Sequence, residues 1–167
     1  MTFRIPVSTQ EPLQVTQEGD SYVRRVYRKQ YLNVNGSVVD TFTVPSGVKI
    51  RPIMLLVETG VVQPAPANCF ARVDFKTGQP DGVGNWIWST LLPSLDNRAI
   101  WHVLSRAGGY GTYDVANAYF GWTYRMNHIP FPDIVLQPFE RIIVEAQNFG
   151  AADSLTVRLS YDEYQRK

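Results

Sequence analysis

The sequence predicts an all-β protein, an antiparallel jelly-roll β-sandwich of two Greek keys preceded by an extended N-terminal arm. Two similar strand–turn–strand units, at 42–50 and 134–142, lie far apart, and each leads into a run rich in β-branched residues. Apolar and polar residues alternate over 154–163, as in a strand with one buried and one solvated face. The eleven prolines lie mostly between such runs, and helical periodicity is scarce.

Residues 1–20 are polar and aperiodic, so we expect them to form the arm, and we expect 21–167 to form a single domain. Asn35-Gly36 predicts a hairpin after the first strand, because both residues tolerate positive φ. The predicted strands are 22–34, 37–44, 48–59, 69–76, 85–92, 99–104, 118–126, 140–148 and 154–163.

The connections between these strands are read from turn residues. Pro45-Ser46-Gly47 predicts a tight corner, since proline fixes φ and glycine relaxes it. Pro52 interrupts an apolar run and predicts an edge strand or a bulge there. The compositions of 77–82 and 148–153 predict loops, whereas 94–104 fits a short helix or a strand equally well.

Composition narrows the class of partner. A net charge of +1 provides no global attraction to nucleic acid or to anionic membranes, so neither is an expected partner. The single cysteine, Cys69, excludes an intrachain disulfide framework and is compatible with a reducing cytoplasm. The N-terminus has no apolar signal region, and the longest apolar run, 53–57, is too short to span a membrane. We expect a soluble product.

No catalytic motif is recognisable, and we expect no enzyme activity, no cofactor and no metal site. His102 and His128 are the only histidines and stand alone in sequence, without a nucleophile context. Cys69 begins a strand and is interpreted as a small core residue. The glycine-rich segment 108–114 lacks the lysine of a phosphate-binding loop. We interpret it as an exposed loop whose tyrosines, Tyr110 and Tyr113, contact a partner.

Aromatic residues make up 13% of the chain and concentrate between 86 and 124. Trp86 and Trp88 are two residues apart and should share one face of a strand, as should Trp122 and Tyr124. Three interpretations stay open for these residues: the core, a subunit interface, or a glycan site. For a glycan site, the candidate hydrogen-bonding residues are Asn85, Asp96, Asp114 and Asn117.

A basic cluster marks the first strand: Arg24, Arg25, Arg28 and Lys29. On a strand these charges divide between both faces, which a buried strand does not tolerate. One interpretation is an edge strand protected by charge against aggregation. The other is a surface that binds an acidic partner through bidentate arginine contacts.

The Val-Pro-Ser-Gly corner at 44–47 and the stretch 142–161 resemble small jelly-roll proteins of tailed-bacteriophage virions. Phe139 departs from the pattern, because glycine is usual after the second corner proline. The resemblance implies a non-enzymatic capsid decoration (cement) protein or a head- or tail-attached knob. It also implies viral coat protein as partner, a virion location after assembly in the host cytoplasm, and a homo-oligomer, commonly a trimer.

Two other hypotheses stay open. One is a carbohydrate- or receptor-binding knob that uses Trp86, Trp88, Trp122 and Tyr110. The other is a cupin-like enzyme with the same double-Greek-key architecture, for which the expected cluster of histidine and carboxylate ligands is missing from the sequence.

Overall fold

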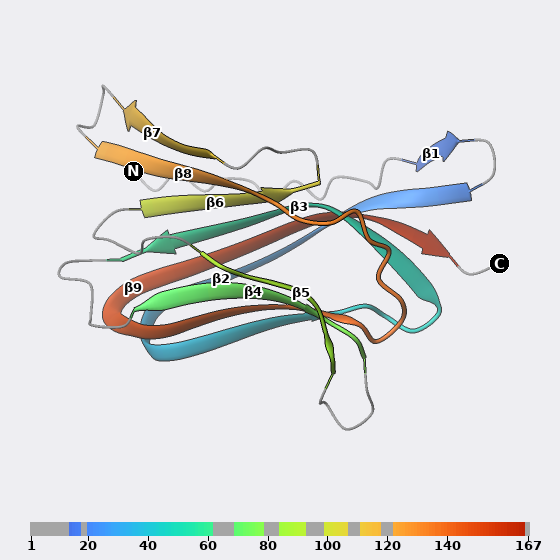
Figure 1. Cartoon of the computed structure of the whole chain (residues 1–167), viewed down its shortest axis with the longest axis horizontal. Helices are drawn as coiled ribbons and strands as arrows, with labels where there is room; N and C mark the ends of the chain where they lie inside the picture. Colours follow the sequence, from blue (N-terminus) through green and yellow to red (C-terminus); the bar gives the residue numbers. More distant parts are fainter. Residues whose placement is uncertain are drawn as a thin grey trace, which may run out of the picture.

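The computed structural model describes residues 14–17, 20–61, 69–78, 84–92, 99–106, 111–117 and 122–165. All regular secondary structure in these residues is β-strand, which confirms the predicted all-β class (Figure 1). The strands are β1 (Gln14–Gln17), β2 (Asp20–Thr43), β3 (Val48–Gly60), β4 (Phe70–Lys76), β5 (Trp86–Leu91), β6 (Ala99–Ser105), β7 (Gly111–Asn117), β8 (Trp122–Pro130) and β9 (Arg141–Gln165).

The described strands form one curled sheet. Its order is β1-β2-β9-β3-β6-β8-β7, with β4 also paired to β9 and β5 paired to β4. All pairs are antiparallel except β6 with β8. The two longest strands, β2 and β9, are paired along almost their whole length. The first pair is Tyr22 with Tyr164 and the last is Thr43 with Arg141. This ribbon doubles back on itself, so its two ends lie in two layers (Figure 1).

The layers are built on the two halves of β9. Its second half pairs with β3, which continues into β6, β8 and β7, and we call this the upper layer. Its first half pairs with β4, which continues into β5, and we call this the lower layer. The pairing joins both layers into one sheet. This topology does not confirm the finer prediction of a sandwich with two Greek keys.

The predicted hairpin at Asn35-Gly36 and the predicted loop at 148–153 are wrong, because both segments lie inside continuous strands. Gly36 is paired with Phe149, and the register shifts on either side of it. Backbone φ is positive at Asn33 (54°), Gly36 (94°) and Asn148 (58°). The turn-forming residues therefore bend two paired strands at the same point, where a bulge sharpens the twist without ending the ladder.

The strand bounds correct two further expectations and decide one open alternative. The predicted strand 118–126 is replaced by β7 and β8, with 118–121 outside the described residues. Residues 111–114 of the glycine-rich segment belong to β7, because their backbone pairs with β8. In the stretch 94–104, the described part forms β6 and 94–98 lie outside the described residues.

The core lies between the two layers. The alternation predicted at 154–163 is confirmed, since Leu155, Val157, Leu159 and Tyr161 are buried; Ile142, Val144 and Ala146 are buried in the lower layer. Phe131, which follows β8, packs against Phe75 (ring centroids 5.6 Å apart) and Trp88 (6.3 Å), and so connects the layers. The bulge predicted at Pro52 is confirmed by a register shift between Pro52 and Met54.

The two predicted corner units lie side by side. Ile50 and Leu136 exchange backbone hydrogen bonds of 3.0 and 2.8 Å and form an isolated bridge between the units. Of the predicted arm, 14–17 form β1, which pairs with the start of β2. Among the described residues, there is no helix of the length and apolar character that a membrane crossing requires.

Candidate binding surfaces

The basic cluster lies on β2. After Val23, where the pairing with β1 ends, β2 has a described neighbour only on its β9 side and is therefore an edge strand among the described strands. Arg24 Nε lies 3.0 Å from Asp162 Oδ1, and Arg25 Nε lies 3.0 Å from Glu163 Oε2. Both carboxylates belong to β9 and are nearly buried. The hydrogen bond to Asp162 raises the pKa of Arg24 above its ordinary value. These two arginines therefore fasten β2 to β9.

Arg28 lies directly opposite Arg158 of β9, and both side chains are exposed. Across the described residues, neither guanidinium has an ion-pair partner. Lys29 is exposed on the other face of β2, opposite Val157. The structure thus splits the predicted cluster: Arg24 and Arg25 are paired, whereas Arg28 and Lys29 have no ion-pair partner in the part of the chain that the structure describes. Sequence reasoning missed Arg158 because only the strand register brings it beside Arg28.

Trp86 and Trp88 do not share a face, contrary to the prediction. Trp88 pairs with Phe75 and packs against the core, whereas Trp86 pairs with Lys76 and is 52% exposed. The register shifts between these two pairs, so Ile87 is an extra residue in β5. A bulge of this kind reverses the side-chain alternation, which places the two indoles on opposite sides of the lower layer.

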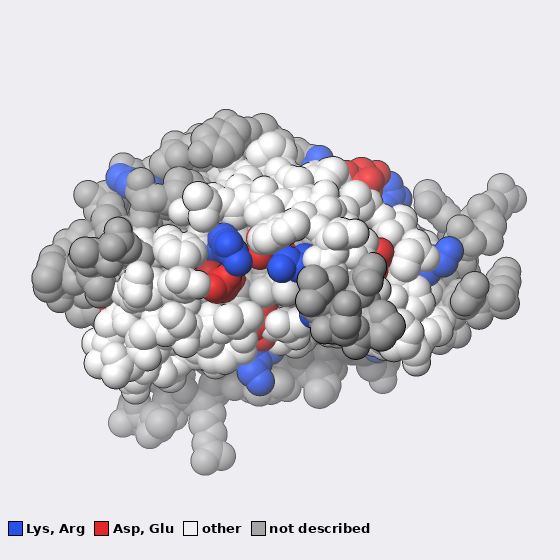
Figure 2. Space-filling view, turned by 60° about the horizontal axis from the view of Figure 1, so that its bottom comes forward, with Lys and Arg blue, Asp and Glu red and all other residues white. Residues whose placement is uncertain are grey.

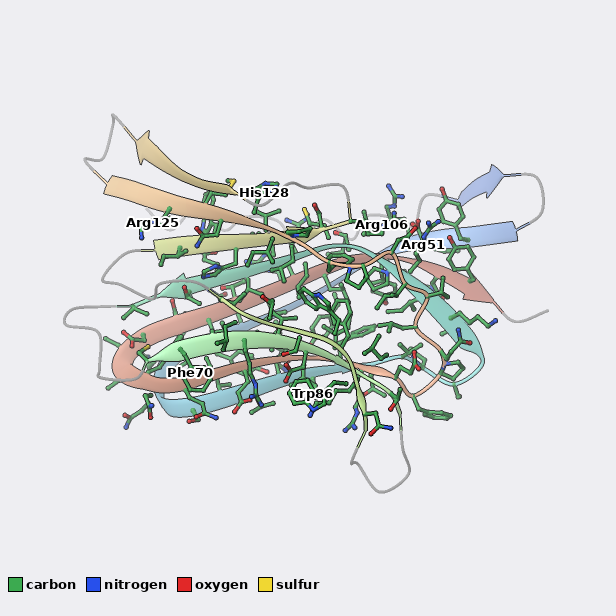
Figure 3. All side chains as sticks on the ribbon, in the orientation of Figure 1. Arg51, Phe70, Trp86, Arg106, Arg125 and His128 are labelled. Carbon is green, nitrogen blue, oxygen red and sulfur yellow. The ribbon has the colours of Figure 1, made fainter. Side chains whose placement is uncertain are left out.

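Trp86 lies on the outer side of the lower layer, away from β3 and β6 (Figure 3). Lys76 Nζ lies 4.2 Å from the centroid of its ring, and Arg72 Cζ lies 5.4 Å from it. Both distances are within the range of cation–π attraction. Arg72 also binds Glu145 (Nη2 to Oε2, 2.7 Å) and lies 3.3 Å from Asp74. The indole therefore lies on a network of charged side chains.

Exposed apolar residues surround this network. Across the ladder, Val39 of β2 pairs with Glu145, Glu145 with Arg72, and Arg72 with Leu91. Val39 is 54% exposed and Leu91 is 68% exposed. We call this region the Trp86 surface and define it by Val39, Arg72, Lys76, Trp86, Ile87 and Leu91. Figure 2 brings the bottom of Figure 1 forward and shows charges of both signs side by side near the middle of that face.

A second charged cluster holds the segment after β8 against the upper layer. Asp133 accepts hydrogen bonds from Arg51 Nε (2.9 Å) and from Arg106 Nη1 (3.1 Å), and its other oxygen contacts Arg51 Nη2. Figure 3 shows the two arginines close together. Their hydrogen bonds lower the pKa of Asp133 to about 2. Asp133 compensates one of the two guanidinium charges, and we interpret the cluster as a structural tie between the segment after β8 and the upper layer.

Polar side chains are buried inside the upper layer. His102 and Asn127 lie on neighbouring strands, with Nδ1 and Nδ2 3.2 Å apart, and Thr59 lies on the next strand. All three are at most 2% exposed. Burial lowers the pKa of His102 to about 4, so its imidazole is neutral near pH 7.

Cys69 is half-buried and packs against the core, as predicted, and burial raises the pKa of its thiol. Among the described residues, no group of three or more His, Cys, Asp or Glu side chains is placed to hold a metal ion.

The other predicted contact residues fall partly outside the structure. Tyr110 lies outside the described residues. Tyr113 of β7 pairs with Met126, and Trp122 and Tyr124 of β8 pair with Asn117 and Val115. Only the backbones of these three aromatic residues are described, so a shared face for Trp122 and Tyr124 stays a prediction. The predicted glycan-binding residue Asp96 is also outside the described residues.

The chain was compared with known proteins. No protein-family model matches it, and no curated protein sequence matches it. Among solved structures it is similar to a chain in the structure of infectious bursal disease virus, Gx strain. That match covers 93% of this chain and 43% of the viral chain, at 15% sequence identity and a TM-score of 0.26. The chain thus spans less than half the length of that viral protein.

Proposed function

We propose that this protein is a non-enzymatic structural protein of a virion that binds coat protein through the Trp86 surface, as a capsid decoration protein does. One observation carries the proposal: Trp86 is 52% exposed yet held in place by Lys76 and Arg72. Tryptophan and arginine are the residues most enriched among binding hot spots. An exposed indole whose position is already fixed loses little side-chain entropy when a partner covers it.

The surroundings of Trp86 support an interface. Glu145 and Asp74 compensate the charge of Arg72, and Ser89 donates a 2.7 Å hydrogen bond to Asp74. Leu91 adds exposed apolar area beside this polar network. An apolar centre with a polar rim is the usual anatomy of a protein–protein interface.

The virion assignment is supported by the sequence resemblance of 44–47 and 142–161 to small jelly-roll proteins of tailed bacteriophages. The doubled-back ribbon of β2 and β9, which encloses one core between two layers, supports the jelly-roll interpretation. A homo-oligomer, with a trimer favoured, belongs to the same proposal.

The test is co-sedimentation of the purified protein with capsids of the virus that encodes it, prepared without this protein. We expect saturable binding, and we expect Trp86→Ala to weaken it at least tenfold, the loss typical of a hot-spot residue. Phe139→Ala is the matched control, because Phe139 is 59% exposed and lies outside the Trp86 surface. If the unmodified protein does not bind, or if Trp86→Ala binds as well as the unmodified protein, the proposal is wrong.

The alternative is a glycan-binding knob, for which the exposed ring of Trp86 is the relevant observation. The cations beside the ring weigh against it, because they cover part of the aromatic surface on which a sugar ring would stack. Titration of tryptophan fluorescence with a glycan panel separates the two functions. A saturable change that Trp86→Phe abolishes, together with no capsid binding, would favour the glycan-binding function.

A further inference from the structure

We propose that Arg28 and Arg158 form a site for a carboxylate side chain, carried by an extended segment of a partner protein that lies alongside β2. The site belongs to the upper layer and involves none of the residues of the Trp86 surface. The experiment on this site therefore tests it independently of the function proposed above.

The first observation is the unusual pairing of two like charges. Arg28 and Arg158 are Cα partners across neighbouring strands and are both exposed. Like charges placed directly opposite each other destabilise a sheet. The neighbouring arginines Arg24 and Arg25 are each neutralised by a carboxylate of β9. In the described part of the chain no carboxylate serves Arg28 or Arg158 in this way.

The second observation is an open strand edge beside this pair. β1 pairs with β2 only from Asp20 to Val23, and no other described strand lies on that side of β2. Open strand edges present unpaired backbone donors and acceptors, to which an extended segment can add. Val26 lies two residues before Arg28, so it points to the same face, and it is 51% exposed. On the other side of Arg158, Leu56 of β3 is half-buried.

These features define the chemistry of the ligand. A carboxylate accepts hydrogen bonds from two planar guanidinium groups and removes their mutual repulsion. An apolar residue two positions away in the segment would cover Val26. A polyanion fits less well, because Asp162 and Glu58 lie on the same face of the sheet as Arg28. The occupant is therefore a strand-forming segment with one acidic residue two positions from an apolar residue.

The probe is the peptide acetyl-TVTET-amide, which places its valine opposite Val26 when it adds parallel to β2 with its glutamate opposite Arg28. Binding to the full chain is followed by amide chemical shifts of β2 in solution NMR. We expect saturable binding that acetyl-TVTQT-amide reduces about tenfold, the loss typical of a charge-assisted hydrogen bond. Arg28→Gln and Arg158→Gln should each cause a similar reduction. Arg24→Gln is the matched control, since it removes the same charge from the same strand and face, and it should change binding less than twofold.

A charge reversal separates recognition from a structural effect. The double variant Arg28→Glu, Arg158→Glu should bind acetyl-TVTKT-amide and no longer bind the glutamate peptide. The proposal is overturned if neither peptide binds the unmodified protein. It is equally overturned if the glutamate and glutamine peptides bind alike, or if Arg24→Gln costs as much as Arg28→Gln.

Discussion

The backbone N–H of Phe139 donates a 2.9 Å hydrogen bond to the carbonyl of Val44, and thereby joins the two corners of the fold. Val44 in turn donates a 2.9 Å hydrogen bond to the carbonyl of Glu140. Phe139 has a φ of 69°, close to the 81° of Gly47 in the other corner. The second corner therefore takes the left-handed backbone that glycine favours, with a phenylalanine in that position.

Phe139→Gly should stabilise the protein, because glycine adopts a positive φ without the steric cost that a Cβ atom brings. The left-handed conformation costs a non-glycine residue about 1–2 kcal/mol. The side chain is 59% exposed, so the burial lost with it offsets only part of this steric cost. Glycine also adds entropy to the unfolded chain, which reduces the gain. We therefore expect the free energy of unfolding, measured with urea, to rise by about 0.5–1 kcal/mol.

The reciprocal change provides the control for this prediction. Gly47→Ala should lower the free energy of unfolding by about 1 kcal/mol, whereas Ser46→Ala in the same turn should have a smaller effect. A loss of stability in Phe139→Gly would show that the phenylalanine side chain contributes more than its backbone conformation costs.

Two tyrosines hold the bend of β2 closed. The hydroxyl groups of Tyr27 and Tyr31 each donate a 2.8 Å hydrogen bond to Oδ1 of Asp40, which is 4% exposed. Tyr27 and Tyr31 lie before the bend and Asp40 lies after it. We expect Tyr27→Phe and Tyr31→Phe each to cost about 1 kcal/mol of unfolding free energy.

The double variant should cost more than the sum of the two, because it leaves a buried carboxylate without either donor. A double-mutant cycle by urea unfolding measures this coupling. Additive losses would mean that other groups satisfy Asp40 once both hydroxyls are gone.

The hydrogen bond between Tyr31 and Asp40 also predicts a loss of stability at alkaline pH. Burial, followed by the hydrogen bond to Asp40, raises the pKa of Tyr31 from 10.0 to about 12. The stabilisation is fully present below pH 10, where both states are protonated, and is lost as the pH rises from about 10 to 12, where the unfolded state ionises first. We expect the stability difference between the unmodified protein and Tyr31→Phe to shrink over this interval. A difference that stays constant from pH 9 to pH 12 would contradict the assigned cause.

Local patterns predicted the class and many strands, since alternation and turn residues are properties of neighbouring positions. They did not predict the curl of the sheet. Asn35-Gly36 looks like a hairpin until Gly36 is found opposite Phe149, a contact that no local pattern contains. The opposite faces of Trp86 and Trp88 depend on a bulge at Ile87 that arises where β5 meets β4.

In the candidate sites too, the contacts depend on strand pairing that no local pattern contains. One of the two interpretations of the basic cluster makes Arg24 and Arg25 available to a partner, but each binds a carboxylate that lies 138 residues away in the chain. Arg158 had no signal of its own, because an isolated arginine in an alternating strand is ordinary. Its position opposite Arg28 follows from the register of β2 and β9, which depends on bulges between Tyr31 and Val38.

His102 predicts a loss of stability in mild acid. Its pKa is lowered by burial from 6.5 to about 4 in the folded state, so the unfolded state binds more protons between these values. Stability should therefore fall as the pH decreases from 6.5 to 4, by up to roughly 3 kcal/mol from this group.

His102→Gln removes the titrating group and keeps a polar side chain near Asn127. It should lower stability at pH 7 and flatten the decline between pH 6.5 and pH 4, as measured by urea unfolding at each pH. Carboxylates titrate in both proteins, so they cancel when the two curves are subtracted. If the subtracted curve is flat, His102 does not resist protonation in the folded state. The decline would then originate from other groups.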